Sequence, residues 1–230
     1  MTALRLAVFD VDGTLADSQA EIVAAMRAAF AAEALDPPAR GDILSIVGLS
    51  LDHAVVQLAP DLPGHRHAAL VAAYRQAYFE QRTRNGASPL YDGALTALEI
   101  LAGDPLLLMG VATGKSRRGL DALIEAHGLE RFFVTRQTSD FHPSKPHPAM
   151  LEAALAEAGV AAGQAVMIGD TSFDMDMARA AGTHGLGVAW GYHAPDRLGP
   201  VPIVKDFAAL PAAVARILGS GPGPETENRS

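Results

Sequence analysis

The sequence has no cysteine and very little lysine. Among 230 residues the only lysines are Lys115, Lys145 and Lys205. A chain without cysteine can form no disulfide, no thiolate nucleophile and no cysteine-ligated metal site, and it is compatible with a reducing compartment. A function that needs an ammonium group therefore has only three places to put it.

Positive charge is also in short supply. Lysine and arginine total 18 against 26 aspartates and glutamates, which gives a formal net charge of −8. An acidic chain without a basic run binds a phosphate backbone poorly, so we expect no nucleic-acid partner. No signal-like apolar segment precedes the first strand-like run, and no uncharged run of about 18 residues exists. We therefore expect a cytoplasmic protein without a membrane segment.

The apolar patterns of the two ends of the chain predict an α/β fold. Residues 4–9 form a short apolar run typical of a buried strand. After Pro89, strand-like and helical patterns alternate. The expected strands are 106–112, 132–135, 165–168, 187–189 and 201–204, and the expected helices are 92–102, 117–127, 147–158, 174–181 and 207–218. This alternation predicts a three-layer, Rossmann-like core with a parallel sheet covered by helices on both faces.

The intervening residues show only helical patterns. Ser18 and Glu21 have the spacing of a capping box before a helix that reaches about residue 34, and further helical patterns cover 43–47, 51–58 and 64–84. We therefore predict a catalytic core made of residues 1–16 and 89–218 and an inserted all-α cap domain over 17–88. The Gly-, Pro- and polar-rich residues 219–230 are expected to be a disordered tail.

Polar residues follow four of the predicted strands. Ligands of a parallel sheet bind at the carboxyl ends of its strands, near the topological switch point. These positions hold Asp10 and Asp12 after the first strand, Thr113 and Gly114 after the second, Lys145 in the loop after the third, and Asp170 and Asp174 after the fourth. We therefore expect all of them to meet in one crevice.

The chemistry of this set is coherent. Converging carboxylates repel one another without a cation, and hard oxygen ligands without cysteine or paired histidine favour Mg²⁺ over zinc. The expected metal residues are Asp10, Asp12, Asp170 and Asp174. Lys145, the Thr113 hydroxyl and the N–H groups at the start of the helix after Ser116 would bind a phosphate group on the other side.

The two aspartates of the first strand end suit different tasks. A free aspartic acid has a pKa near ~3.9, so a proton donor at neutral pH needs a pKa raised by roughly 2 units, whereas a nucleophile must stay ionised. Asp10 would stay ionised on the metal, and Asp12 would hold a proton away from it. Hydrolases often divide two neighbouring carboxylates in this way.

These residues resemble the four motifs of the haloacid dehalogenase-like hydrolase superfamily. The motifs are Asp10-Val11-Asp12-Gly13-Thr14-Leu15, Thr113, Lys145, and Gly169-Asp170-Thr171-Ser172-Phe173-Asp174, in the family's order from about residue 5 to 218. The resemblance implies that Asp10 is the nucleophile and that Asp12 is the general acid and base, whose backbone carbonyl also binds Mg²⁺. It implies that Thr113 and Lys145 hold the phosphate. Asp170 would bind the metal directly, and Asp174 directly or through water.

Simpler interpretations remain open for several residues. Lys145 is also compatible with a solvated loop charge, and Asp170 and Asp174 with acids that stabilise a helix N-terminus. His142 and His147 are expected to be ordinary loop histidines, because no third nitrogen or sulfur ligand accompanies them. The loop of residues 48–51 resembles the substrate-facing loop of relatives that act on small substrates. Trp190, Tyr192 and His193 are compatible with the crevice rim, the core or the surface.

Within the superfamily, the sequence excludes some activities. Dehalogenases resemble this chain but lack the second aspartate of the first motif, whereas Asp12 is present. Related phosphonate hydrolases use a cap lysine, and residues 17–88 contain none, which excludes that activity. Phosphosugar mutases of this type also rely on a cap lysine and are less favoured for the same reason. The overall likeness, through Thr113-Gly114-Lys115-Ser116 and Ser144-Lys145-Pro146-His147-Pro148, is to phosphoglycolate phosphatase-like proteins with a helical cap.

The expected function is therefore a Mg²⁺-dependent phosphatase that acts on a small phosphorylated metabolite, with phosphoglycolate as one candidate. A broader hydrolase of sugar phosphates, nucleotides or pyrophosphate is the first alternative. A catalytically silent phosphate-binding protein that kept the fold is the second.

Overall fold

The core is a six-stranded parallel sheet in the order β3-β2-β1-β4-β5-β6. The computed structural model describes residues 3–219. The strands are β1 (Arg5–Phe9), β2 (Leu107–Thr113), β3 (Phe133–Thr138), β4 (Ala165–Gly169), β5 (His184–Val188) and β6 (Ile203–Val204). After β1 the chain builds β2 and β3 on one side and then crosses to build β4 on the other. The topological switch point therefore lies between β1 and β4, where such sheets bind ligands.

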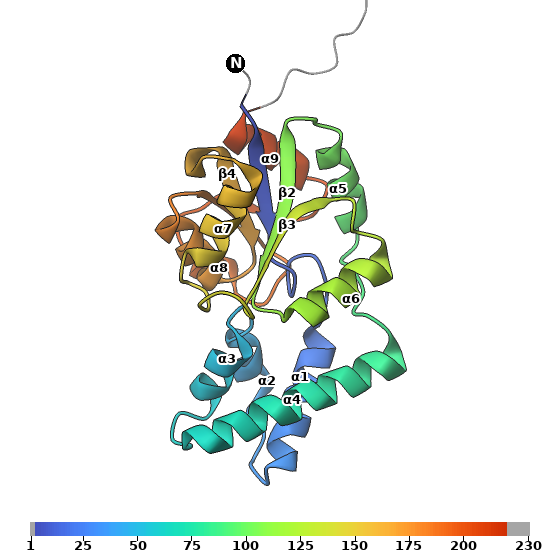
Figure 1. The fold of residues 1–230 in the computed structure, drawn as a ribbon, viewed down its shortest axis with the longest axis vertical. Coiled ribbons are helices and arrows are strands. Elements are labelled where there is room, and N and C mark those ends of the chain that lie inside the picture. Colours follow the sequence, from blue (N-terminus) through green and yellow to red (C-terminus); the bar gives the residue numbers. More distant parts are fainter. Residues whose placement is uncertain (1–2, 220–230) are drawn as a thin grey trace, which may run out of the picture.

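Helices cover both faces of this sheet (Figure 1). Because successive residues of a strand point to opposite faces, Phe9 packs with α5 (Ala94–Ala102), α6 (Arg117–His127) and α9 (Leu210–Leu218). Val8 packs on the other face with α7 (Ala149–Ala158) and α8 (Ser172–Ala180). The predicted three-layer α/β architecture is confirmed.

A separate group of helices lies beyond the carboxyl end of the sheet (Figure 1). These are α1 (Gln19–Ala32), α2 (Arg40–Ser45), α3 (Leu51–Leu58) and α4 (Gly64–Asn85), and they surround an apolar cluster of their own. Residues 17–88 are all described and contain no strand, as predicted.

The two chain segments that join these helices to the core lie side by side. Ala16 and Leu90 form an antiparallel bridge, and the backbone N–H of Asp17 donates to the carbonyl of Pro89 at 2.9 Å. Such a paired crossing is compatible with a hinge. The division into a core and a cap at residues 16 and 89 stays a prediction.

Three local predictions are corrected. Ser18 precedes α1 but makes no side-chain capping bond, because its hydroxyl donates to Asp12 Oδ1 instead. The strand expected at 187–189 begins earlier, at His184, where pairing with Val166 extends it. The helix expected at 174–181 begins at Ser172 because Thr171 caps it.

Two further expectations concern the C-terminal tail and membrane-spanning segments. The tail expected at 219–230 lies, apart from Gly219, outside the described residues. Among the described residues, no helix is both long enough and apolar enough to cross a membrane.

Candidate active site

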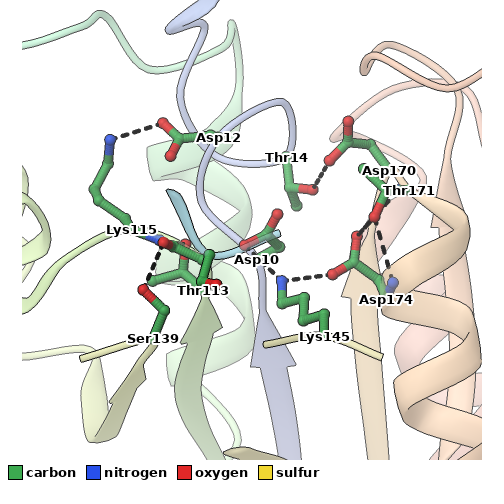
Figure 2. Close-up of polar contacts among 12 residues, drawn as sticks. Asp10, Asp12, Thr14, Thr113, Lys115, Ser139, Lys145, Asp170, Thr171 and Asp174 are labelled. Carbon is green, nitrogen blue, oxygen red and sulfur yellow. Dashed lines mark hydrogen bonds and ion pairs between the residues drawn. The ribbon is translucent and has the colours of Figure 1, made fainter. Parts of the chain in front are cut away.

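Three buried carboxylates meet at the switch point (Figure 2). Asp10 follows β1 and Asp170 follows β4, and these neighbouring strands are in register at Phe9 and Ile168. Asp174 lies in the first turn of α8. One oxygen atom from each carboxylate lies within 4.8 Å of the other two. The sheet topology thus brings together three of the four predicted acids.

Local hydrogen bonds orient two of these carboxylates. Asp174 Oδ2 accepts hydrogen bonds from the backbone N–H of Thr171 at 3.0 Å and from its hydroxyl at 2.7 Å, which completes a capping box. Asp170 accepts from the Thr14 hydroxyl at 2.9 Å and from the backbone N–H of Tyr192 at 2.8 Å. Asp174 therefore stabilises the N-terminus of α8 and also faces the carboxylate cluster, and its role as a metal ligand stays a prediction.

Lys145 is the cation of this cluster. Its Nζ lies 2.9 Å from Asp10 Oδ1 and 2.6 Å from Asp174 Oδ1, and its side chain is 0% exposed. The solvated-loop interpretation of Lys145 is thereby excluded. Burial lowers the pKa of Lys145, but the carboxylates of Asp10 and Asp174 outweigh it and raise the pKa above the ordinary value. Lys145 is therefore charged at neutral pH.

One ammonium group does not balance three carboxylates. Burial raises the pKa of Asp10 to about 7, with Lys145 opposing the shift and Asp174 adding to it. Burial, followed by the charges of Asp174 and Asp10, also raises the pKa of Asp170 well above its ordinary value. Asp10 Oδ2 is buried and has no hydrogen-bond partner among the described residues. An electron-rich oxygen without a partner, in a group of hard ligands, fits a divalent cation such as Mg²⁺.

The side chain of Asp12 faces away from this cluster, toward the cap. Its Oδ1 accepts a hydrogen bond from the Ser18 hydroxyl at 2.5 Å and lies 2.9 Å from Lys115 Nζ. Asp10 and Asp12, which are two residues apart, thus lie in different surroundings. The Asp12 side chain is not part of the carboxylate cluster. The predicted contact of the Asp12 backbone carbonyl with the metal stays a prediction.

The end of β2 forms the other wall. Thr113 is buried at the strand end, and its Oγ1 accepts a hydrogen bond from the backbone N–H of Lys115 at 3.2 Å. Ser116 caps α6 as predicted, with its Oγ accepting from the N–H of Gly119. Thr113 and the N-terminal turn of α6 therefore line the same pocket as Asp10.

Gly114 is where the cap meets this wall. A Cβ atom at Gly114 would lie 2.5 Å from the carbonyl oxygen of Leu49 and 2.6 Å from that of Gly48. Only glycine permits so close an approach of two backbones. The cap loop of residues 48–51 therefore lies at the site, and Gly48, Leu49 and Leu51 line the pocket.

Sequence reasoning did not find the side-chain contacts around Asp12. Lys115 Nζ lies 3.2 Å from the Tyr78 hydroxyl and 5.0 Å from the centre of the Tyr78 ring, so it joins the core to α4. The Ser18 hydroxyl also lies 3.1 Å from that of Tyr192. Lys115 is one of only three lysines in the sequence and directly follows Gly114. Its contact with Tyr78 could not be predicted, because it depends on how the cap packs on the core.

Gly191 lies against the carboxylate cluster. A Cβ atom at Gly191 would lie 2.0 Å from the Cβ of Asp170 and 2.3 Å from its Oδ2. The backbone of residues 190–192 therefore packs directly on Asp170, and it supplies the N–H of Tyr192 that holds this carboxylate. Only a residue without a side chain fits between this segment and Asp170.

Replacing Gly191 with alanine is expected to destabilise the fold by about 1–3 kcal/mol, because the added methyl group forces the backbone away from Asp170. Urea unfolding measures this loss, and metal affinity should fall with it. Gly41→Ala is the matched control, because a Cβ at Gly41 meets no atom within 4 Å. Equal stability of the two variants would contradict the packing argument.

The two histidines that flank Lys145 lie outside the cluster, as predicted. His142 Nε2 contacts Gln137 Oε1 at 2.8 Å, and His147 Nδ1 accepts from the backbone N–H of Ala149. Neither belongs to the acidic group that could hold a metal ion.

The fold and this site can be compared with known proteins. The family model described as "Haloacid dehalogenase-like hydrolase" matches residues 7–188, which include all four groups of site residues. The chain belongs to the haloacid dehalogenase-like hydrolase family. It is thus an enzyme of a hydrolase family, and the resemblance inferred from the four motifs is confirmed.

Relatives and solved structures agree with this membership. The chain is 35% identical to the Probable phosphatase IndB of Dickeya dadantii, over 93% of this chain and 94% of that protein. It is 32% identical to the Phosphoglycolate phosphatase of Caulobacter vibrioides, over 95% and 94%. The crystal structure of a hydrolase from Pseudomonas syringae superposes with a TM-score of 0.81 at 26% identity, covering 93% of this chain and 99% of that one. The hydrolase described here therefore resembles phosphatases over nearly its whole length.

Proposed function

We propose that this hydrolase is a Mg²⁺-dependent phosphatase that cleaves small phosphate monoesters through an aspartyl-phosphate on Asp10. The observation that supports it most directly is the Oδ2 atom of Asp10, buried beside two carboxylates and one ammonium group without a hydrogen-bond partner among the described residues. The names of its relatives support the phosphatase assignment.

The bound metal is proposed to lie among Asp10, Asp170 and Asp174, with the Asp12 carbonyl as a further ligand. When bound, Mg²⁺ would supply positive charge beside the phosphate and keep Asp10 ionised. Lys145 and Thr113, together with backbone N–H groups from Gly114 onward, are proposed to hold the phosphate oxygens.

The first chemical step is attack on phosphorus by one carboxylate oxygen of Asp10, while the other would remain on the metal. A phosphorus–oxygen bond forms to the carboxylate as the bond to the leaving alcohol breaks, and Asp12 gives its proton to that alcohol. In the second step, Asp12 takes a proton from water, the water oxygen attacks phosphorus, and phosphate and the Asp10 carboxylate are released. The Asp12 side chain faces the cap and not the carboxylate cluster, so it is free of the proposed metal and can exchange a proton with the alcohol or with water.

Phosphate release from p-nitrophenyl phosphate, with Mg²⁺ and with excess chelator, tests the proposed activity. Hydrolysis that chelation abolishes supports it. Tight phosphate binding without turnover would instead favour the silent phosphate-binding protein. Turnover of phosphoglycolate, sugar phosphates, nucleotides and pyrophosphate then separates a phosphoglycolate phosphatase from a broader hydrolase.

The metal site makes its own prediction. In Asp170→Asn, the amide keeps hydrogen-bonding atoms for Thr14 and Tyr192 but removes a negative charge, so Mg²⁺ affinity should fall sharply. Wild-type protein should gain about 2.7 kcal/mol of stability at a metal concentration 100 times Kd, and the variant should gain far less. Thermal unfolding with and without Mg²⁺ measures both.

The matched control for this experiment is Asp176→Asn. Asp176 lies on the same helix, α8, but is paired with Arg179 outside the cluster. Its Mg²⁺-dependent stabilisation should equal that of the wild type. A full response of Asp170→Asn to Mg²⁺ would remove Asp170 from the proposed site.

A further inference from the structure

The pocket above Asp10 is larger than the proposed reaction on a two-carbon ester requires. Its volume is about 560 Å³, within the ~300–1,000 Å³ typical of pockets that hold drug-sized ligands. It reaches from Asp10 and Thr113 at the sheet to Arg82 on α4 and Arg118 on α6. Phosphate bound at the sheet would leave much of this space for the alcohol portion of the substrate.

One stripe of α4 forms the cap wall of this pocket. Tyr74, Tyr78 and Arg82 recur at intervals of four residues and therefore lie on one face of the helix. The eight residue steps from Tyr74 to Arg82 correspond to roughly 12 Å at ~1.5 Å per residue. Tyr78 contacts Lys115 beside Asp12, so this stripe runs from the phosphate region outward.

The outer end of the stripe is positively charged in an acidic protein. Phe79 is 41% exposed, and the guanidinium carbons of Arg118 and Arg82 lie 4.6 and 5.9 Å from the centre of its ring. Across the described chain neither arginine forms an ion pair with a carboxylate. Arg75, on the same wall, differs from them because its guanidinium group forms a long, exposed ion pair of 4.0 Å with the carboxylate of Asp52. Two arginines that form no ion pair and lie beside one phenyl ring at a pocket have donors available for an anion.

We propose that Arg82, Arg118 and Phe79 form a subsite for a second anionic group of the substrate. The substrate class is then a phosphate monoester larger than phosphoglycolate whose alcohol portion carries a carboxylate or a second phosphate. This inference rests on the proposed phosphatase function, and it adds a specificity determinant that spans cap and core. Arg82 comes from α4 and Arg118 from α6, so the bound anion would also draw the two parts together.

The test compares three sugar esters of similar size. Glucose 6-phosphate has no second anion, 6-phosphogluconate carries a carboxylate, and glucose 1,6-bisphosphate carries a second phosphate. The wild-type enzyme should prefer at least one of the two doubly anionic esters, in kcat/KM, to both glucose 6-phosphate and phosphoglycolate. Which of them it prefers identifies the anion.

The double variant Arg82→Ala/Arg118→Ala should lose that preference. The expected loss in kcat/KM is about tenfold to a hundredfold for the preferred ester, mainly through KM, because charge-assisted hydrogen bonds to the anion are removed. Hydrolysis of glucose 6-phosphate should change by less than about threefold. Arg84→Ala and Arg117→Ala are matched controls. Arg84 lies on α4 with Arg82, and Arg117 lies on α6 with Arg118, but both are outside the pocket lining and each is paired with a carboxylate one turn away.

Two results would overturn the subsite. One is a wild-type enzyme that turns over the three sugar esters equally or prefers phosphoglycolate to all of them. The other is a double variant that loses activity equally on every ester. A wild-type enzyme that hydrolyses none of these esters, nor p-nitrophenyl phosphate with Mg²⁺, would instead overturn the proposed function.

Discussion

Asp10→Asn is expected to reduce turnover by roughly four powers of ten or more while leaving the fold intact. The amide is nearly the same size as the carboxylate but is a far weaker nucleophile. In the proposed mechanism no other group can form the covalent intermediate, because the remaining carboxylates of the cluster are engaged by Thr14, Tyr192, Thr171 and Lys145. Single-turnover phosphate release measures the loss.

The same substitution should stabilise the metal-free protein at high pH. Burial raises the pKa of Asp10 from 3.8 to about 7 on folding. For an acid with a raised folded-state pKa, stability is lost as the pH increases from the unfolded value toward the folded one. In chelator, the wild type should therefore lose on the order of a few kcal/mol between pH 4 and pH 7 through this residue, and Asp10→Asn should not.

Urea unfolding in chelator at several pH values measures this difference. Asp61→Asn, at an exposed turn of the cap, is the control and should behave like the wild type. A variant of Asp10 that keeps more than a few per cent of activity would place the nucleophile elsewhere. A variant with the pH dependence of the wild type would show that Asp10 is not the strained carboxylate.

Much of the core could be predicted from sequence, because its strands are short apolar runs and these runs alternate regularly with helical patterns. The exceptions are strands whose pairing extends them beyond their apolar residues. β3 continues through Arg136 and Gln137 to Thr138 because these residues pair with the end of β2. Polar residues such as these are typical of loops, and they form a strand here because they pair with β2.

The site could be predicted as far as topology alone determines it. Residues that directly follow parallel strands must meet at one edge of the sheet, and Asp10, Asp170 and Thr113 do so. Contacts made through the cap could not be predicted. The Ser18 hydroxyl was expected to cap α1, but the docked geometry places Asp12 within its reach, and a charged acceptor forms the stronger hydrogen bond.

Lys145→Met is expected to destabilise the metal-free protein by about 3–5 kcal/mol and to abolish turnover. Within residues 3–219, Lys145 supplies the only ammonium group that contacts the buried carboxylates of Asp10 and Asp174, and methionine has a similar shape without the charge. Its removal leaves like charges facing each other in a buried cluster without a counter-charge. Lys205→Met, at an exposed position, should cost little.

A double-mutant cycle shows whether the charge of Lys145 or its packing is responsible. If Lys145 stabilises the fold by neutralising Asp10, then Asp10→Asn should recover part of the loss in Lys145→Met, and the two effects should differ from additivity by about 1–3 kcal/mol. Mg²⁺ should also recover stability in Lys145→Met, because a cation among the carboxylates replaces the missing charge. The double variant carries less buried charge and provides a folded reference if Lys145→Met alone does not fold. Strictly additive losses, together with no response to Mg²⁺, would mean that Lys145 acts through packing and that the cluster requires no counter-charge.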